Sequence, residues 1–125
     1  DRLQVFTPEG KFVKEMIYKP ETRADGSVWD IAFSKDPQQK YLFMADGVNE
    51  RVVVIDRKDL KVLTTFGGGG NHPGEFHGVH SIATDSKNNI YTTETYGGRR
   101  LQKFVYKGDS AVTKFDQGVP RPDNK

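Results

Sequence analysis

The sequence predicts an all-β fold made of repeated units of short antiparallel strands, and three observations lead to this prediction. Aromatic and β-branched residues gather in short clusters that Gly, Asp, Asn and Pro separate, which is typical of many short strands. Within the clusters, apolar residues alternate with a period of two rather than 3.6. The clusters also recur along the chain at a nearly constant spacing, which indicates an internal repeat.

The repeat is clearest in three segments that begin with arginine: Arg2–Phe6, Arg51–Ile55 and Arg100–Phe104. Successive arginines are 49 residues apart. Two further pairs repeat in the same order, with offsets of 51 and 48 residues: Val28–Ala32 with Val79–Ala83, and Leu42–Asp46 with Ile90–Glu94. Small differences between offsets are what varying loop lengths produce, so the three elements define one repeating unit.

Each full unit is expected to hold four strands, with no helix longer than one turn because Gly and Pro interrupt every candidate. The turns carry Asp, Asn and Gly, for example at 46–49 and 85–89, where such residues tolerate positive φ. Four antiparallel strands in 40 to 50 residues is the pattern of a β-propeller blade. The expected strands are Arg2–Phe6, Phe12–Ile17, Val28–Phe33, Tyr41–Ala45, Arg51–Asp56, Lys61–Phe66, His80–Thr84, Asn89–Thr93, Arg100–Tyr106 and Ala111–Phe115.

The predicted architecture is a propeller fragment of about two and a half four-stranded antiparallel blades. Residues 1–18 form the outer two strands of an incomplete blade, 19–67 and 68–116 form complete blades, and 117–125 form a tail or linker. Unpaired strand edges are a liability in native proteins. The remaining blades are therefore expected from a longer chain or from other subunits.

One stretch carries a family resemblance. Gly74-Glu-Phe, then His80-Ser-Ile-Ala-x-Asp85, Asn89-Ile-Tyr-x-x-Glu94 and Arg100-Leu-Gln-Lys-Phe104 resemble the NHL repeat, whose consensus has PGxF, IAVD, GNIYVAD and RIQVF. The resemblance covers residues 2 to about 107. It implies a propeller of six blades and an extracytoplasmic location, periplasmic or secreted.

Composition excludes several classes of function. The chain has 125 residues, 19 basic and 17 acidic side chains, a net charge of +2 and no cysteine. Lys and Arg are scattered, which argues against nucleic-acid binding, and no apolar stretch approaches the about 20 residues of a membrane span. The glycine run at 67–70 lacks the spacing and the following helix of a phosphate-binding loop. No nucleophile–base pair is visible, so the catalytic residues stay unknown.

The candidate ligand-binding residues are Trp29, His80, Tyr96 and Arg99, which we expect to form one side of a polar-aromatic pocket at the channel rim. Such a pocket suits a small ligand or a peptide end. For Trp29, packing between blades is the open alternative. Asp30 follows Trp29 and offers one oxygen to calcium, an ion that takes six to eight.

His80 is also the candidate metal ligand. The stretch Val79-His-Ser-Ile-Ala83 is similar to PHSLA in peptidyl-α-hydroxyglycine α-amidating lyases, NHL propellers that hold zinc with three histidines from different blades. The resemblance implies zinc at His80. The counterpart in the preceding unit is Trp29, which cannot bind a metal, and only Tyr96 matches the place of the family's catalytic tyrosine.

Two acid–arginine pairs recur across matching turns: Asp46 with Arg51, and Glu94 with Arg100 or Arg99. A carboxylate and a guanidinium so placed are expected to meet and to fix the register of the turn. Two hypotheses of function remain. The chain is a binding or scaffolding module for a protein or small ligand, or a metal-dependent lyase or hydrolase of the amidating-lyase or lactonase type.

Overall fold

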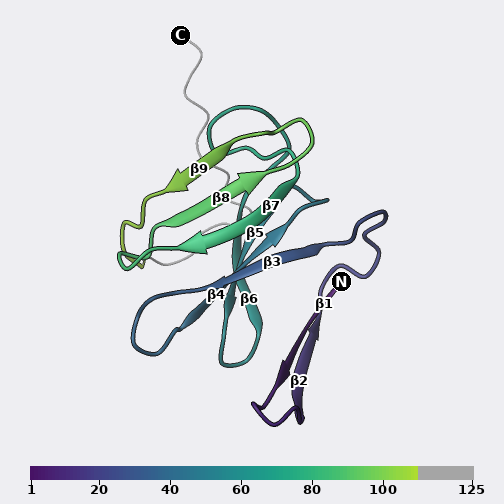
Figure 1. Ribbon diagram of the computed structural model, residues 1–125, viewed down its shortest axis with the longest axis vertical. Coiled ribbons are helices and arrows are strands. Elements are labelled where there is room, and N and C mark those ends of the chain that lie inside the picture. Colours follow the sequence, from purple (N-terminus) through teal and green to yellow (C-terminus); the bar gives the residue numbers. More distant parts are fainter. Residues whose placement is uncertain (110–125) are drawn as a thin grey trace.

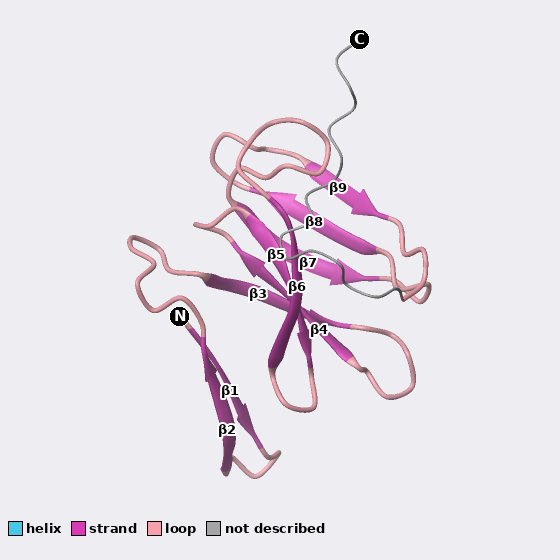
Figure 2. Ribbon diagram, turned by 180° about the vertical axis from the view of Figure 1, so that it is seen from behind, coloured by secondary structure: helices cyan, strands magenta, loops and turns pink. Residues whose placement is uncertain are grey.

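The computed structural model describes residues 1–109, which form strands and connecting turns without a helix (Figures 1 and 2). The described part of the chain thus offers no helix long and apolar enough to cross a membrane. The strands are β1 (Arg2–Phe6), β2 (Phe12–Ile17), β3 (Val28–Phe33), β4 (Tyr41–Asp46), β5 (Arg51–Asp56), β6 (Lys61–Gly67), β7 (Val79–Thr84), β8 (Ile90–Glu94) and β9 (Leu101–Phe104).

The strands make three antiparallel sheets of two, four and three strands, in the orders β1-β2, β3-β4-β5-β6 and β7-β8-β9. The all-β prediction is confirmed. The expected strand ends agree with the observed ones to within two residues, and the largest difference is at β9, which was expected to span Arg100–Tyr106. The expected strand Ala111–Phe115 and the tail at 117–125 lie outside the described residues.

The four-stranded sheet is packed on both faces. Its first face, with Leu42, Met44, Val53 and Ile55, contacts Leu3, Val5 and Met16 of the β1–β2 hairpin. The second face, with Phe43, Ala45 and Val52, contacts Val79, Ile82 and Ile90 of the β7–β9 sheet. Alternating side chains of one strand therefore serve two different interfaces, which explains why β4 is apolar at nearly every position.

Within residues 1–109, the β7–β9 sheet is packed on one face only. Its other face carries Ala83, Thr93, Leu101 and Lys103, which are exposed, and the side chain of Leu101 is 65% accessible. The matching positions in the four-stranded sheet are Ala32, Ala45, Val52 and Val54, which β7–β9 shields. The described residues thus cover this sheet face in one unit and leave it exposed in the next.

Candidate functional site: an aromatic cluster at paired bulges

The site is built on two β-bulges at matching places in the repeat. In β3 the register shifts between Val28 and Asp30, and in β7 it shifts between Val79 and Ser81. Trp29 and His80 are the residues left out of the ladder. A bulge of this kind redirects a side chain, and bulges are frequent next to functional sites.

The bulges bring Trp29 and His80 into contact although they are 51 residues apart. Their ring centroids lie 5.5 Å apart with the planes at 67°. The ring of Tyr96, from the turn after β8, lies 6.2 Å from that of Trp29 at 66°. Both contacts have the edge-to-face geometry that aromatic pairs prefer. Three of the four predicted ligand-binding residues therefore form one cluster.

The backbone around the cluster holds Trp29 in place. The Trp29 indole N–H donates to the carbonyl of Gly26 at 2.8 Å. On the other side, a Cβ added to Gly47 would lie 2.0 Å from the indole ring, so only glycine fits in this turn. Trp29 thus packs between β3 and β7 and also contributes to the aromatic cluster.

Tyr96 stands at the solvent side of the cluster. It is 60% exposed, and its hydroxyl donates to Asp25 Oδ2 at 2.9 Å. This bond to a carboxylate raises the pKa of the Tyr96 phenol. The backbone of Tyr96 has a φ of +50°, which is uncommon for a bulky residue and marks strain of the kind found at functional sites.

Arg99, the fourth predicted residue, closes the same turn. Its φ is +45°, and its Nε donates to the carbonyl of Tyr96 at 3.0 Å. The guanidinium is exposed and lies next to the cluster along the chain, where it supplies positive charge at the edge of the aromatic surface.

Asp30 ties the two bulges together, a role that the sequence did not predict. Its Oδ1 accepts from its neighbour's N–H, that of Ile31, at 2.8 Å. Its Oδ2 accepts from the N–H of Ile82 on β7 at 2.9 Å. Both oxygens therefore accept from backbone amides, and the Oδ2 bond links β3 to β7. This leaves Asp30 a poor calcium ligand. In the sequence, the only signal for this role is that Asp30 directly follows Trp29.

The described residues do not complete a metal site. His80 Nδ1 lies 3.0 Å from Ser81 Oγ, whereas His77 turns the other way, with Nδ1 3.4 Å from Glu50 Oε1. No group of three or more His, Cys, Asp or Glu side chains that suits a metal occurs between residues 1 and 109. Zinc would need further ligands beyond His80, and residues 1–109 do not supply them.

The two predicted acid–arginine pairs differ. Arg100 Nε donates to Glu94 Oε1 at 2.6 Å, and the Glu94 side chain is fully buried. Asp46 does not bond to Arg51 as expected. Its Oδ1 instead accepts from the side chain of Asn49 at 2.8 Å, and its Oδ2 is buried with no hydrogen-bond partner among the described residues.

The geometry of the β4–β5 turn explains why Asp46 and Arg51 do not meet. Asp46 and Arg51 are a cross-strand pair at the end of the ladder, and the short aspartate reaches only into its own turn. Arg51 Nε donates to the carbonyl of Asn49 at 3.1 Å. Asn49 therefore stands between the carboxylate and the guanidinium.

No protein-family model matches the chain, and the comparison with curated proteins gave no match.

Proposed function

We propose that the chain is a segment of a six-bladed NHL-type propeller, about two and a half blades long. The offset of about 49 residues and the motifs at Gly74–Glu94 support the family. The face of β7–β9 that residues 1–109 leave exposed matches a face that is covered in the preceding sheet, which supports a further blade beside it. By the same resemblance we propose an extracytoplasmic location.

We further propose that the segment is a binding module for a protein or small ligand, with the cluster of Trp29, His80 and Tyr96 as its contact surface. One observation carries this proposal: two equivalent bulges and one strained turn bring together three aromatic rings, of which His80 and Tyr96 are exposed and Trp29 is partly buried. Large, rigid aromatic side chains give contact area at low cost in conformational entropy and are enriched at binding hot spots.

The cluster favours a ligand with an apolar part and an anionic end. The rings offer flat surfaces for stacking, and the exposed Arg99 guanidinium offers hydrogen-bond donors to a carboxylate. A peptide with a free carboxyl end has both features. The metal-dependent alternative draws on His80 alone and gains nothing from the other described residues.

The test uses the one tryptophan of the chain as its probe. Pools of acetylated tripeptides with free carboxyl ends are titrated while the emission of Trp29 is recorded. We expect the Trp29 emission to change as at least one pool is added, and to reach a constant value at high peptide concentration. In Tyr96→Ala and His80→Ala the same pool should bind about tenfold more weakly or worse, as expected for loss of a hot-spot side chain.

Phe12→Ala is the matched control, because Phe12 is an exposed aromatic residue on β2 (57% accessible) and lies outside the cluster. It should leave the titration unchanged. The proposal is wrong if no pool changes the emission, or if the change survives in both cluster variants. The lyase alternative predicts instead zinc bound at one per chain and lost in His80→Ala.

A further inference from the structure

Within residues 1–109, the two outermost sheets each leave one face exposed. The β1–β2 hairpin and the β7–β9 sheet pack on opposite faces of the β3–β6 sheet, so the three sheets stand in a row (Figure 1). The far side of the hairpin is one end of this row, and we call it the hairpin face; the far side of β7–β9 is the other end, and we call it the open face. The hairpin face carries Gln4, Phe6, Glu15 and Ile17, and the open face carries Ala83, Thr93, Leu101 and Lys103.

The chain joins its sheets twice by the same kind of contact. Val5 of β1 packs in one apolar cluster with Ile55 of β5. One unit later, Val54 of β5 packs in one apolar cluster with Phe104 of β9. Val54 follows Val5 by 49 residues, and Phe104 follows Ile55 by 49. Each contact therefore joins two unlike faces, and a contact of this kind can continue from one molecule to the next.

The two end faces are the unused members of this series. Lys103 on the open face follows Val54 by 49 residues, and Phe6 on the hairpin face precedes Ile55 by 49. The open face is thus of the kind that packs against the following unit, and the hairpin face is of the kind that packs against the preceding unit. A second copy of the chain carries the matching partner for each.

Both end faces expose large apolar side chains. Phe6 and Ile17 on the hairpin face are 51% and 56% accessible, and Leu101 on the open face is 65% accessible. Val52, which corresponds to Leu101 in the covered sheet, is fully buried. Apolar side chains gathered on an exposed face are typical of interaction sites.

The two end faces also carry opposite charges. On the hairpin face, the Glu15 carboxylate accepts from Gln4 Nε2 at 3.1 Å. On the open face, the Lys103 ammonium lies 5.3 Å from the centroid of the Tyr91 ring. In the contact inside the chain, the residues that correspond to Lys103 and Gln4 belong to one apolar cluster. A second copy that repeats this contact therefore brings Lys103 close to Gln4 and to the carboxylate of Glu15.

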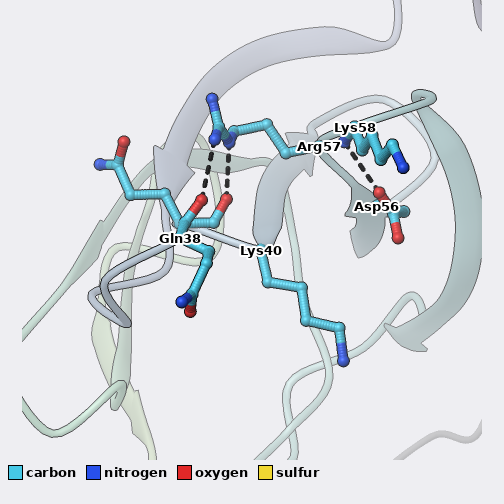
Figure 3. A pocket seen from close by; sticks show the side chains of 6 residues that line it. Gln38, Lys40, Asp56, Arg57 and Lys58 are labelled. Atoms are coloured by element: carbon cyan, nitrogen blue, oxygen red, sulfur yellow. Dashed lines mark hydrogen bonds between the residues drawn. The ribbon is translucent and has the colours of Figure 1, made fainter.

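The hairpin is held in a fixed position on the β3–β6 sheet. Lys14, on the inner side of the hairpin, donates through Nζ to the carbonyls of Arg57 and Lys58 in the β5–β6 turn. Arg57 in turn donates through Nε and Nη2 to the carbonyls of Gln39 and Gln38, at 2.7 Å and 2.8 Å, in the β3–β4 turn (Figure 3). The hairpin face is thus already ordered, which lowers the entropic cost of association.

We propose that copies of this chain associate head to tail, with the hairpin face of one copy on the open face of the next. Glu15 of one copy and Lys103 of the other form an ion pair across this contact. The proposal rests on the order of blades in the proposed propeller segment and does not depend on the aromatic cluster. A two-stranded hairpin is smaller than a full blade, so we expect a Kd on the order of 10⁻⁴ M, as for small interfaces.

Sedimentation velocity measures the association over a range of chain concentrations that extends about tenfold to either side of this Kd. We expect the average sedimentation coefficient to rise with concentration. Glu15→Lys and Lys103→Glu should each weaken the association about tenfold, because each replaces an attraction across the contact by a repulsion. An equimolar mixture of the two variants should associate about as strongly as the unmodified chain, since each variant supplies the charge that the other needs.

Lys58→Glu is the matched control for Lys103→Glu. Lys58 is an exposed lysine of the middle sheet that belongs to neither end face, and the change in charge is the same, so the association should stay as it is. Leu101→Ser should weaken the association about tenfold by removing apolar contact area. Because Leu101 is exposed, this variant should keep the melting temperature of the unmodified chain.

The proposal is overturned if the chain stays monomeric over the whole range, as it would if another segment covers the open face. It is also overturned if the mixture of charge variants does not associate, or if Lys58→Glu weakens the association as much as Lys103→Glu does. A monomeric chain would leave the proposed propeller intact, because its other blades can come from a longer chain. The peptide titration of Trp29 emission tests ligand binding separately, and both charge variants should keep the response of the unmodified chain.

Discussion

The β4–β5 turn and the β8–β9 turn occupy matching positions in the repeat, and each contains a buried carboxylate. The hydrogen bonding of the two carboxylates is very different. Glu94 Oε1 accepts from Arg100 and from Gln102 Nε2 at 2.8 Å, and its Oε2 accepts from the N–H of His77 at 2.7 Å. Asp46 is equally buried, but its bonds come only from Asn49, and its Oδ2 has no partner among the described residues.

The length of the side chain and of the turn accounts for this difference. Arg51 directly begins β5 and pairs with Asp46 in the ladder, whereas Arg100 precedes β9 and lies outside it. Arg100 can therefore turn back toward the segment before β7, where its guanidinium also donates to the carbonyl of Asn71 at 2.6 Å. An acid and an arginine that repeat at matching positions therefore need not form the same contact.

We expect the largest difference in stability when the same isosteric change, from acid to amide, is made at Glu94 and at Asp46. Glu94→Gln should lower the free energy of unfolding by about 3 kcal/mol, near the lower limit for breaking a buried pair, because Arg100 keeps some solvent access. Asp46→Asn should change it by less than about 1 kcal/mol, since the unpaired buried charge is itself unfavourable. Urea denaturation of both variants measures the difference.

Glu15→Gln is the control for this comparison, because Glu15 is an exposed carboxylate on β2, and it should be nearly neutral. Equal losses in Glu94→Gln and Asp46→Asn would contradict our account of the two turns. A double-mutant cycle on Asp46 and Arg51 should likewise give a coupling energy close to zero.

Much of the fold could be predicted from the sequence, because strands are specified by local patterns. The period of two and the Asp, Asn and Gly turns define where β3 to β8 begin and end. The alignment of Trp29 with His80 followed from the same repeat. The partners of individual side chains were harder to predict from the sequence. The contacts of Asn49 and Asp30 depend on distances of a few ångströms, which the spacing of residues along the chain does not determine.

The next effect tests how firmly the aromatic cluster depends on its backbone support. Gly47→Ala should lower the free energy of unfolding by about 1–3 kcal/mol, the usual loss for overpacking, because the new Cβ would collide with the Trp29 indole. Trp29 emission and urea denaturation would report the change together.

A double variant tests whether the contact with the Trp29 indole causes this loss of stability. In Trp29→Ala, which removes the ring, the added Gly47→Ala change should have little further effect on the free energy of unfolding. If Gly47→Ala is as damaging without the indole as with it, the glycine is required by the backbone of the turn and not by the contact with Trp29.

We expect the smallest change in stability in a second pair of matching turns, β3–β4 and β7–β8. In the latter, bonds from Asn89, from the Lys87 N–H and from the Tyr91 hydroxyl lower the pKa of Asp85 from 3.8 to about 2. In the former, the Ser34 hydroxyl and the N–H groups of Lys40 and Gln38 lower the pKa of Asp36 in the same direction. Both carboxylates close their turns on the surface.

A carboxyl group whose pKa is lower in the folded state stabilises the fold above its unfolded pKa, and this contribution disappears as the pH falls through the folded value. For Asp85 the loss should therefore occur between about pH 4 and pH 2. Asp85→Asn should melt below the unmodified chain at pH 5, and the two melting temperatures should converge toward pH 2. Asp36→Asn should show the same convergence. A difference in melting temperature that stays constant from pH 5 to pH 2 would mean that the turns depend on the shape of the side chain and not on its charge.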